Sequence, residues 1–319
     1  MKVKKEYIGL AVVIVALCLV LILRRGDRTH YRLPVLAPVS AQQITKLVIA
    51  RADSALTLER RGDLWRIAPY GYPADTSQVN RMIEAVAGFT ITELVSEAGN
   101  YVPYELDPEK RVVVEAFEGD RSLLKFSIGK PAPTYSHTFV LLENDPRVYQ
   151  ARENLRSELD RRTEQLRDKL VLTVAKDGIA GLALVGTRDS LALRRVGGGS
   201  GAVPPAPADT AIAARGPLWQ TADGKAVDEQ AIERILDKLV TLRCDGFIDG
   251  RAKGDFKDPI FTVRVDGAEP VSLSIYDKGE DAKYPAVSSE SEYPFYLGEW
   301  LVKQIMKKPE DLLGKARES

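Results

Sequence analysis

The chain has 319 residues, with 45 Lys or Arg and 45 Asp or Glu, so its formal net charge is zero. Binding to nucleic acid needs a basic face that displaces counterions from phosphates, and this balance argues against it. The two cysteines, Cys18 and Cys244, lie in an apolar run and at the end of a predicted helix, so no structural disulfide is expected within one chain.

Residues 8–23 form an uninterrupted apolar run between Lys5 and Arg24. The run covers roughly 24 Å as a helix, and the flanking cations can reach the interfaces of a ~30 Å hydrocarbon core. Because no small-residue cleavage site follows it, residues 1–25 are interpreted as an uncleaved transmembrane anchor rather than a signal peptide. Equal numbers of basic residues precede and follow the run, so the positive-inside count does not decide the orientation. We favour a single pass through the inner (cytoplasmic) membrane with the body facing the periplasm or exterior, since the short basic N-terminus resembles an uncleaved export signal.

Residues 26–43 contain prolines and lack a sustained period, which is typical of a tether. From residue 44 the apolar residues alternate, and turn residues stand at 52–54 and 61–63, which predicts three antiparallel strands. The alternating pairs are Leu47 and Ile49, Leu56 and Leu58, and Trp65 and Ile67.

An amphipathic helix is predicted to begin after Asp75, a good N-cap residue, with an apolar stripe at Val79, Met82, Ile83 and Val86. Two hairpins are predicted next, at 111–129 and at 139–151, because alternating residues flank turn sequences there. A charged helix over 153–169 closes this first region.

The second half repeats the first. Residues 75–83 match residues 228–236 without a gap, and each copy follows a tryptophan, Trp65 or Trp219, by about ten residues. Strand signals recur in the same order, including 261–265 and 271–276, and a last helix is predicted over 296–306. The predicted fold is therefore α+β, with a single N-terminal transmembrane helix followed by two tandem repeats, 44–173 and 174–319, each an antiparallel β-sheet with packed helices.

Residues 197–217 are rich in Gly, Ala and Pro and are predicted to form a flexible insert between paired strands. The glycine run lacks the Lys-Ser/Thr and the strand-to-helix setting of a phosphate-binding loop.

Catalytic machinery is sparse. The two histidines are His30, in the predicted tether, and His137. Ser136 is adjacent to His137, and neighbours in a regular strand point to opposite faces, so a nucleophile-base contact is not expected. The Cys and His residues lack the spacing of a zinc site, and several aspartates are explained as caps or turns. We therefore expect no catalytic residue, no metal and no cofactor.

Ordered short motifs give the chain a likeness to a known family. They are Trp65-Arg66-Ile67, Pro73-Ala74-Asp75, Tyr104-Glu105-Leu106-Asp107-Pro108, Ser127-Ile128-Gly129-Lys130, Val148-Tyr149 and Leu166-Arg167-Asp168-Lys169. From about residue 44 to its end the chain resembles the bacterial envelope proteins grouped as domain of unknown function 4340. A common form of that family has Gly where Glu105 stands here. The resemblance implies an anchored, duplicated α+β protein, often encoded beside a gliding-motility-type ABC transporter, and implies no catalytic residues.

Possible contacts with a partner or ligand are Tyr101, Tyr104 and Tyr135, which fall in proline-containing loops, and Arg167. Exposed aromatics anchor proteins or stack on sugars because they combine a large contact area with a low entropy cost. The alternative is that the tyrosines pack over sheet edges as local lids, and that the arginine lies on a solvated helix face or inter-repeat linker.

The sequence thus predicts a non-enzymatic membrane-anchored envelope protein, a scaffold or accessory component of an ABC-type transport or gliding-type complex. Its expected partners are the membrane and the transporter subunits. An envelope hydrolase acting on glycan or peptide, or a stand-alone glycan-binding module, remain the alternatives.

Overall fold

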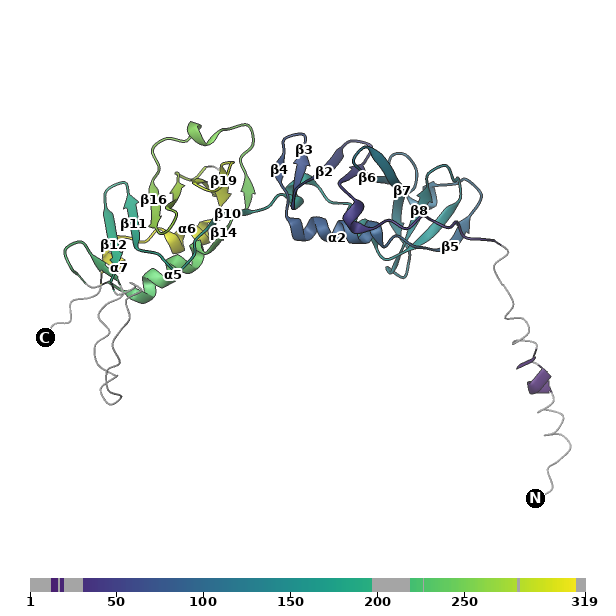
Figure 1. The fold of residues 1–319 in the computed structure, drawn as a ribbon, viewed down its shortest axis with the longest axis horizontal. Coiled ribbons are helices and arrows are strands. Elements are labelled where there is room, and N and C mark those ends of the chain that lie inside the picture. Colours follow the sequence, from purple (N-terminus) through teal and green to yellow (C-terminus); the bar gives the residue numbers. More distant parts are fainter. Residues whose placement is uncertain are drawn as a thin grey trace, which may run out of the picture. The chain divides into compact units, whose positions relative to one another are not determined.

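The computed structural model describes residues 13–16, 18–19, 31–196, 219–225, 227–279 and 282–313. The chain divides into two compact units between Arg167 and Asp168, called unit 1 and unit 2 below (Figure 1). Each unit is built mainly of antiparallel sheet with few helices, which agrees with the antiparallel sheets of the predicted α+β class.

Most of the predicted anchor, residues 1–25, lies outside the described residues. Residues 13–16 and 18–19 are helical. Within the part of the chain that the structure describes, no helix is both long enough and apolar enough to span a membrane. The predicted insert at 197–217 also lies outside the described residues.

The end of the predicted tether packs against unit 1. Leu33, Leu36 and Val39 lie against its core, and the backbone N–H of Leu94 donates to the hydroxyl of Tyr31 at 3.1 Å. A segment without regular structure can still bury apolar side chains. From Tyr31 onward this segment is therefore part of unit 1 and not a free tether.

Unit 1 contains a sheet of nine strands in the order β4-β3-β2-β1-β6-β7-β8-β9-β5. Their bounds are β1 Lys46–Ala50, β2 Ala55–Arg61, β3 Leu64–Ala68, β4 Tyr72–Pro73, β5 Ile91–Ser96, β6 Val112–Glu118, β7 Arg121–Pro131, β8 His137–Leu142 and β9 Val148–Arg152. The three strands and two hairpins predicted from alternation are all present.

The main helix of unit 1 is α2, Thr76–Ala87. It begins where predicted, because the Asp75 carboxylate accepts the backbone N–H of Gln78 at 3.1 Å. Its predicted stripe of Val79, Met82, Ile83 and Val86 is buried in the main core of the unit. Shorter helices are η1 Ala41–Gln43, η2 Val102–Tyr104, α3 Leu155–Leu159 and α4 Thr163–Leu166.

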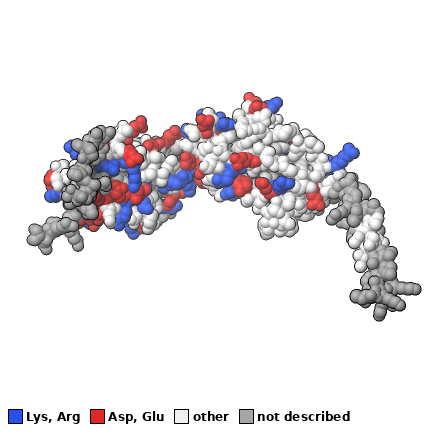
Figure 2. Space-filling model, turned by 60° about the horizontal axis from the view of Figure 1, so that its bottom comes forward, with Lys and Arg blue, Asp and Glu red and all other residues white. Residues whose placement is uncertain are grey.

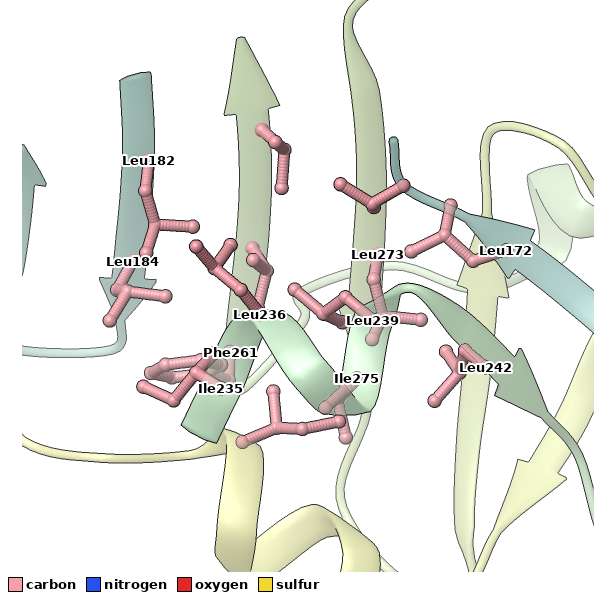
Figure 3. Close-up of a cluster of buried hydrophobic side chains, with 14 of the residues drawn as sticks. Leu172, Leu182, Leu184, Ile235, Leu236, Leu239, Leu242, Phe261, Leu273 and Ile275 are labelled. Atoms are coloured by element: carbon pink, nitrogen blue, oxygen red, sulfur yellow. The ribbon is translucent and has the colours of Figure 1, made fainter. Parts of the chain in front are cut away.

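Unit 2 contains an eight-stranded sheet in the order β13-β12-β11-β16-β17-β18-β19-β15, and a small pair, β10-β14. The strands are β10 Leu170–Thr173, β11 Gly181–Gly186, β12 Ser190–Arg195, β13 Trp219–Thr221, β14 Thr241–Arg243, β15 Gly246–Phe247, β16 Phe261–Asp266, β17 Val271–Ile275, β18 Tyr284–Ser288 and β19 Phe295–Leu297. The helices are α5 Glu229–Leu239, η3 Lys253–Asp255, α6 Glu299–Ile305 and α7 Pro309–Leu312. Figure 3 shows Ile235, Leu236 and Leu239 of α5 facing the strands of the sheet.

Corresponding hydrogen bonds occur inside the two units. The Asp228 carboxylate caps α5 by accepting the N–H of Ala231, as Asp75 does for α2. The backbone N–H of Asp75 donates to Leu166 at 2.8 Å, and that of Asp228 donates to Leu312, also at 2.8 Å.

The tryptophans also occupy matching positions within the two sheets. Trp65 pairs with Arg60, two residues after Leu58, and Trp219 pairs with Arg195, two residues after Leu193. Leu58 pairs in turn with Leu47, and Leu193 pairs with Leu182. The register of β11, β12 and β13 in unit 2 therefore matches that of β1, β2 and β3 in unit 1.

Two helix predictions were wrong in their extent. The charged segment 153–169 is not one helix but two, α3 and α4, because the backbone leaves the helical conformation at Asp160 and is extended at Arg162. The helix predicted over 296–306 is α6, which begins at Glu299 because residues 295–297 form β19, paired with β18, and a further helix, α7, follows it.

Candidate functional site

Unit 1 has a second, smaller core on the face of its sheet opposite α2. In β8, Val140 belongs to the main core, whereas Phe139 and Leu141 belong to the small one. Alternate residues of a strand point to opposite faces, so the two cores lie on opposite sides of the sheet. The loop over residues 97–111, called the aromatic loop below, covers this small core with Tyr101 and Tyr104.

The aromatic loop is held close to the sheet at Gly129 of β7. A Cβ atom added at this position would lie 2.9 Å from Cγ of Leu106 and closer still to the carbonyl oxygen of Tyr104. The ring of Tyr104 packs against Phe139 with a centroid distance of 4.9 Å. Glu105 takes the left-handed conformation at φ 54°, so the turn forms without glycine, and its carboxylate pairs with Arg156 at 3.3 Å.

A groove of about 510 Å³ opens between the aromatic loop, β6, β7 and the turn from β8 to β9. The hydroxyl of Tyr101 donates to the carbonyl of Pro146 at 3.1 Å, and both residues line the groove. Apolar and polar groups share its lining: Arg111, Val113, Lys125, Phe126, Ser127, Leu141, Leu142, Glu143, Asn144 and Asp145. We call this the unit 1 groove.

A hydrogen-bonded network stabilises the turn beside the groove. Two nitrogens of the Arg147 guanidinium, Nε and Nη2, donate to the Asp145 carboxylate, at 2.9 and 2.8 Å. The buried hydroxyl of Tyr149 donates to the same carboxylate at 2.8 Å. The Arg147 hydrogen bonds lower the pKa of Asp145 to about 2, while burial, together with the negative Asp145, raises the pKa of Tyr149 to about 12.

Opposite charges balance inside the unit 1 groove. The ammonium of Lys125 lies 3.2 Å from Glu115 and 3.6 Å from Glu143, and its hydrogen bond and charge interaction with Glu115 raise its pKa. Arg111 makes no ion pair among the described residues. Basic and acidic side chains are also interspersed over each unit on the face shown in Figure 2.

The Asp145 network predicts a pH dependence of stability. Because the folded-state pKa of Asp145 is lowered to about 2, its contribution is present above about pH 4 and is lost as the pH falls through about 2. Tyr149 has a raised pKa, so its contribution is present below about pH 10 and is lost as the pH rises toward 12. In Asp145→Asn the acid part of this dependence should shrink by about 2 kcal/mol at most.

Urea unfolding at a series of pH values, followed by tryptophan fluorescence, measures this difference. Asp120→Asn is the matched control, because the Asp120 carboxylate is fully exposed. Equal acid dependence in Asp145→Asn and in the unmodified chain would contradict the role given to Arg147.

The four residues predicted as contacts lie in different environments. Tyr101 and Tyr104 are half-buried and pack as lids over the small core. Tyr135 is 74% exposed, at φ 57° in the turn before β8. Arg167 is 2% exposed, and its guanidinium stacks on the Tyr72 ring at 3.8 Å. The structure therefore places Arg167 in the interior and not on a solvated helix face, because the chain leaves α4 at this residue.

Ser136 and His137 do make contact, contrary to the expectation from strand geometry. The Ser136 hydroxyl lies 3.1 Å from Nδ1 of His137. Ser136 precedes β8 and belongs to the turn, so the alternation of a regular strand does not apply to it. Within the described residues no carboxylate hydrogen-bonds to His137.

Sequence reasoning missed the unit 1 groove and the Asp145 network. The signal that could have found the network is the alternation of Asp145, Arg147 and Tyr149 in the segment that leads into β9, because residues at i, i+2 and i+4 of an extended chain share a face. Glu115 and Lys125 come from paired strands, and their contact depends on the register. Among the described residues, no group of three His, Cys, Asp or Glu side chains could hold a metal ion.

The chain belongs to the family described as domain of unknown function (DUF4340), whose model matches residues 65–262. The match begins at Trp65 and runs from unit 1 into unit 2, ending within β16. Comparison with curated proteins and with solved structures found no match.

Proposed function

We propose that this DUF4340 chain is a non-enzymatic, membrane-anchored envelope protein that acts as a scaffold or accessory component of an ABC-type transport complex. The observation that carries the proposal is the turn that presents Tyr135. It starts at Ala132, which is buried in the small core, and the Tyr135 N–H donates to Ala132 at 2.8 Å. An exposed aromatic side chain on a fixed turn is a typical anchor for a protein partner.

Anchoring and location form part of the same proposal. The apolar run at residues 8–23 with flanking Lys5 and Arg24 supports a single pass through the inner membrane, with the body facing the periplasm. A reporter fused after Ser319 that functions only when exported tests the orientation. Activity of a cytoplasm-specific reporter at the same position would reverse it.

We also propose that the two units arose by duplication and that each acts as a rigid scaffold. Three observations support this: the same order of eight strands, to which unit 1 adds β4, the matched caps at Asp75 and Asp228, and the matched bonds to Leu166 and Leu312. Each unit has its own core, so each can hold a surface in place without contributing chemistry.

Replacing Tyr135 should weaken capture of the transporter subunits with little effect on folding. Asn tolerates the left-handed backbone of this turn, so Tyr135→Asn removes the ring without adding strain. Loss of one aromatic anchor is worth about 2 kcal/mol or more, roughly a thirtyfold loss of affinity. Co-purification of the tagged full chain from mild detergent, with quantification of bound subunits, measures the effect.

Tyr70→Asn is the matched control, because Tyr70 is 72% exposed in the same unit. Equal capture by Tyr135→Asn and by the unmodified chain, or equal losses in both variants, would contradict the assignment of Tyr135. Failure of any transporter subunit to co-purify with the unmodified chain would contradict the scaffold proposal.

The contact between Ser136 and His137 favours a hydrolase as the second candidate. The contact uses Nδ1, and an enzyme would need this nitrogen to accept the hydroxyl proton. Ser136→Ala in the full chain distinguishes the two functions at matched protein level. A phenotype like that of a deletion, with transporter capture unchanged, would favour the hydrolase.

A further inference from the structure

An arginine in unit 1 joins a strand turn to the helical end of the unit. Nε of Arg51 donates to the Asp160 carboxylate at 2.6 Å, and Nη2 donates to the carbonyl of Arg161 at 2.7 Å. The Arg51 side chain is 15% exposed. It thus fills the space between the turn from β1 to β2 and the segment between α3 and α4, and we call this contact the arginine clamp.

Unit 2 has the same backbone at this place but different side chains. The N–H of Arg51 closes its turn on Ser54 at 2.7 Å, and the N–H of Gly186 closes the turn from β11 to β12 on Asp189 at 2.7 Å. Gly186 therefore stands where unit 1 has Arg51.

The helical side of the clamp corresponds in the same way. The N–H of Asp160 donates to Arg156, four residues earlier, and the N–H of Met306 donates to Val302. One residue further along, the N–H of Arg161 donates to the carbonyl of Leu159, and the N–H of Lys307 donates to the carbonyl of Ile305, both at 2.9 Å. Met306 therefore stands where unit 1 has Asp160, and both partners of the clamp are replaced.

A pocket of about 560 Å³ lies at this place in unit 2. Its floor is apolar and includes Leu184, Phe261 and Met306. Phe261 pairs across the sheet with Gly186, and Figure 3 shows the side chains of Leu184 and Phe261 at the same end of the unit 2 core.

The rim of this pocket is mainly basic. Arg188, Lys307 and Lys308 line it, with Asp189 as the single carboxylate. Lys308 pairs with Glu310 at 3.5 Å, where both side chains are largely exposed. Within the described residues, Arg188 and Lys307 form no ion pair, so two cations beside an apolar floor are available to a ligand.

The backbone does not require a glycine at position 186. An added Cβ atom would meet only the carbonyl oxygen of Asp189 at 3.4 Å and a ring carbon of Phe261 at 3.8 Å, which are ordinary contacts. Gly186 is also not among the glycines with a positive φ. An arginine can therefore be placed there, as in unit 1.

We propose that this unit 2 pocket binds a small amphipathic anion. An apolar body would lie on Leu184, Phe261 and Met306, and a carboxylate, sulfonate or phosphate group would contact Arg188 and Lys307. Charge-assisted hydrogen bonds to such cations are the stronger kind, and the apolar floor adds burial of the ligand body. In unit 1 the arginine clamp occupies the corresponding place.

Methyl-labelled methionine gives a direct test in the full chain, held in phosphatidylcholine nanodiscs. The three methionines are Met1, Met82 and Met306. Naphthalenesulfonate should shift the methyl resonance of Met306 in a saturable way and leave that of Met82, buried in the unit 1 core, unchanged. The neutral naphthalenesulfonamide should bind about tenfold more weakly, because it lacks the charge.

Two variants connect the shift to the pocket. Gly186→Arg fills the pocket, so the sulfonate should no longer shift Met306. Arg188→Gln/Lys307→Gln keeps the pocket open and should weaken sulfonate binding by about tenfold or more, while sulfonamide binding stays the same. Arg61→Gln/Arg81→Gln in unit 1 removes the same charge from exposed positions and should change neither.

Several results would overturn the proposal. They are an unchanged Met306 resonance at saturating sulfonate, equal affinities for sulfonate and sulfonamide, or a shift that persists in Gly186→Arg. If Gly186→Arg fails to fold, the Gln variant still decides the outcome, because an unchanged sulfonate affinity there would also contradict the assignment. None of these measurements depends on a transporter partner, so the test is independent of the proposed scaffold function.

Discussion

Replacing Gly129 with valine should lower the free energy of unfolding of unit 1 by about 3 kcal/mol, through overpacking and the loss of the loop contacts. The added Cβ atom would lie 2.9 Å from Cγ of Leu106 and nearer to the Tyr104 carbonyl, and neither the strand nor the loop backbone can yield cheaply. The aromatic loop would lift, which separates Tyr104 from Phe139 and exposes the small core. Because valine has a high preference for β-strands, a loss of stability in Gly129→Val cannot be caused by a poor strand preference of the new residue.

Amide hydrogen exchange in peptides from β6 measures this effect within unit 1, because the slowest amides of a core strand report global opening. Gly246→Ala in β15 of unit 2 is the control, since nothing lies within 4 Å of an added Cβ atom there, and its effect is measured in peptides from β16 of the same sheet. It should change stability by less than about 0.5 kcal/mol. Unchanged exchange in Gly129→Val would mean that the aromatic loop is not packed against the sheet.

The local elements of the fold were predictable from the residues. Alternation located β1, β2 and β3, and the cap at Asp75 together with the stripe from Val79 to Val86 located α2. These signals act over a few residues, so the sequence contains them directly. The order of the strands depends on pairings such as β1 with β6 and β5 with β9, which join distant segments, and no local pattern determines them.

The candidate site was less predictable for a related reason. Its parts lie in turns and on the second face of the sheet, and the alternation of residues along a strand does not predict the contacts made there. Ser136 meets His137 because the turn departs from extended geometry, and Tyr101 reaches Pro146 across 45 residues. The difference between Arg51 and Gly186 becomes informative only when the two turns are seen to have the same hydrogen bond.

Arg167 shows how a charged residue in a polar run can be an interior residue. Charge alone suggested a solvated surface, yet the guanidinium plane is covered by the Tyr72 ring. An isolated backbone bridge between Ala74 and Arg167 holds the chain there. Arginine can be buried in this way because its flat, weakly hydrated group stacks on aromatic faces while its stem packs among apolar atoms.

Arg167→Ala should therefore lower the free energy of unfolding of unit 1 by about 3 kcal/mol, because it removes both the stacking on Tyr72 and a large buried side chain. Its ion pair with Glu164, at 3.6 Å, adds little, since Glu164 is 60% exposed. Hydrogen exchange in peptides from β1 measures the loss. Arg162→Ala is the control, because that neighbour is exposed and its loss should cost less than about 0.5 kcal/mol.

The same pair of variants separates the two roles considered for Arg167. If Arg167 acts by packing, hydrogen exchange should be faster in Arg167→Ala, and any loss of transporter capture should follow the loss of folded protein. If Arg167 is a surface anchor, exchange should be unchanged and capture should be weaker at matched protein level. The stacking distance of 3.8 Å and the 2% exposure of Arg167 favour the first result, because a side chain covered to this degree can reach a partner only after the unit opens.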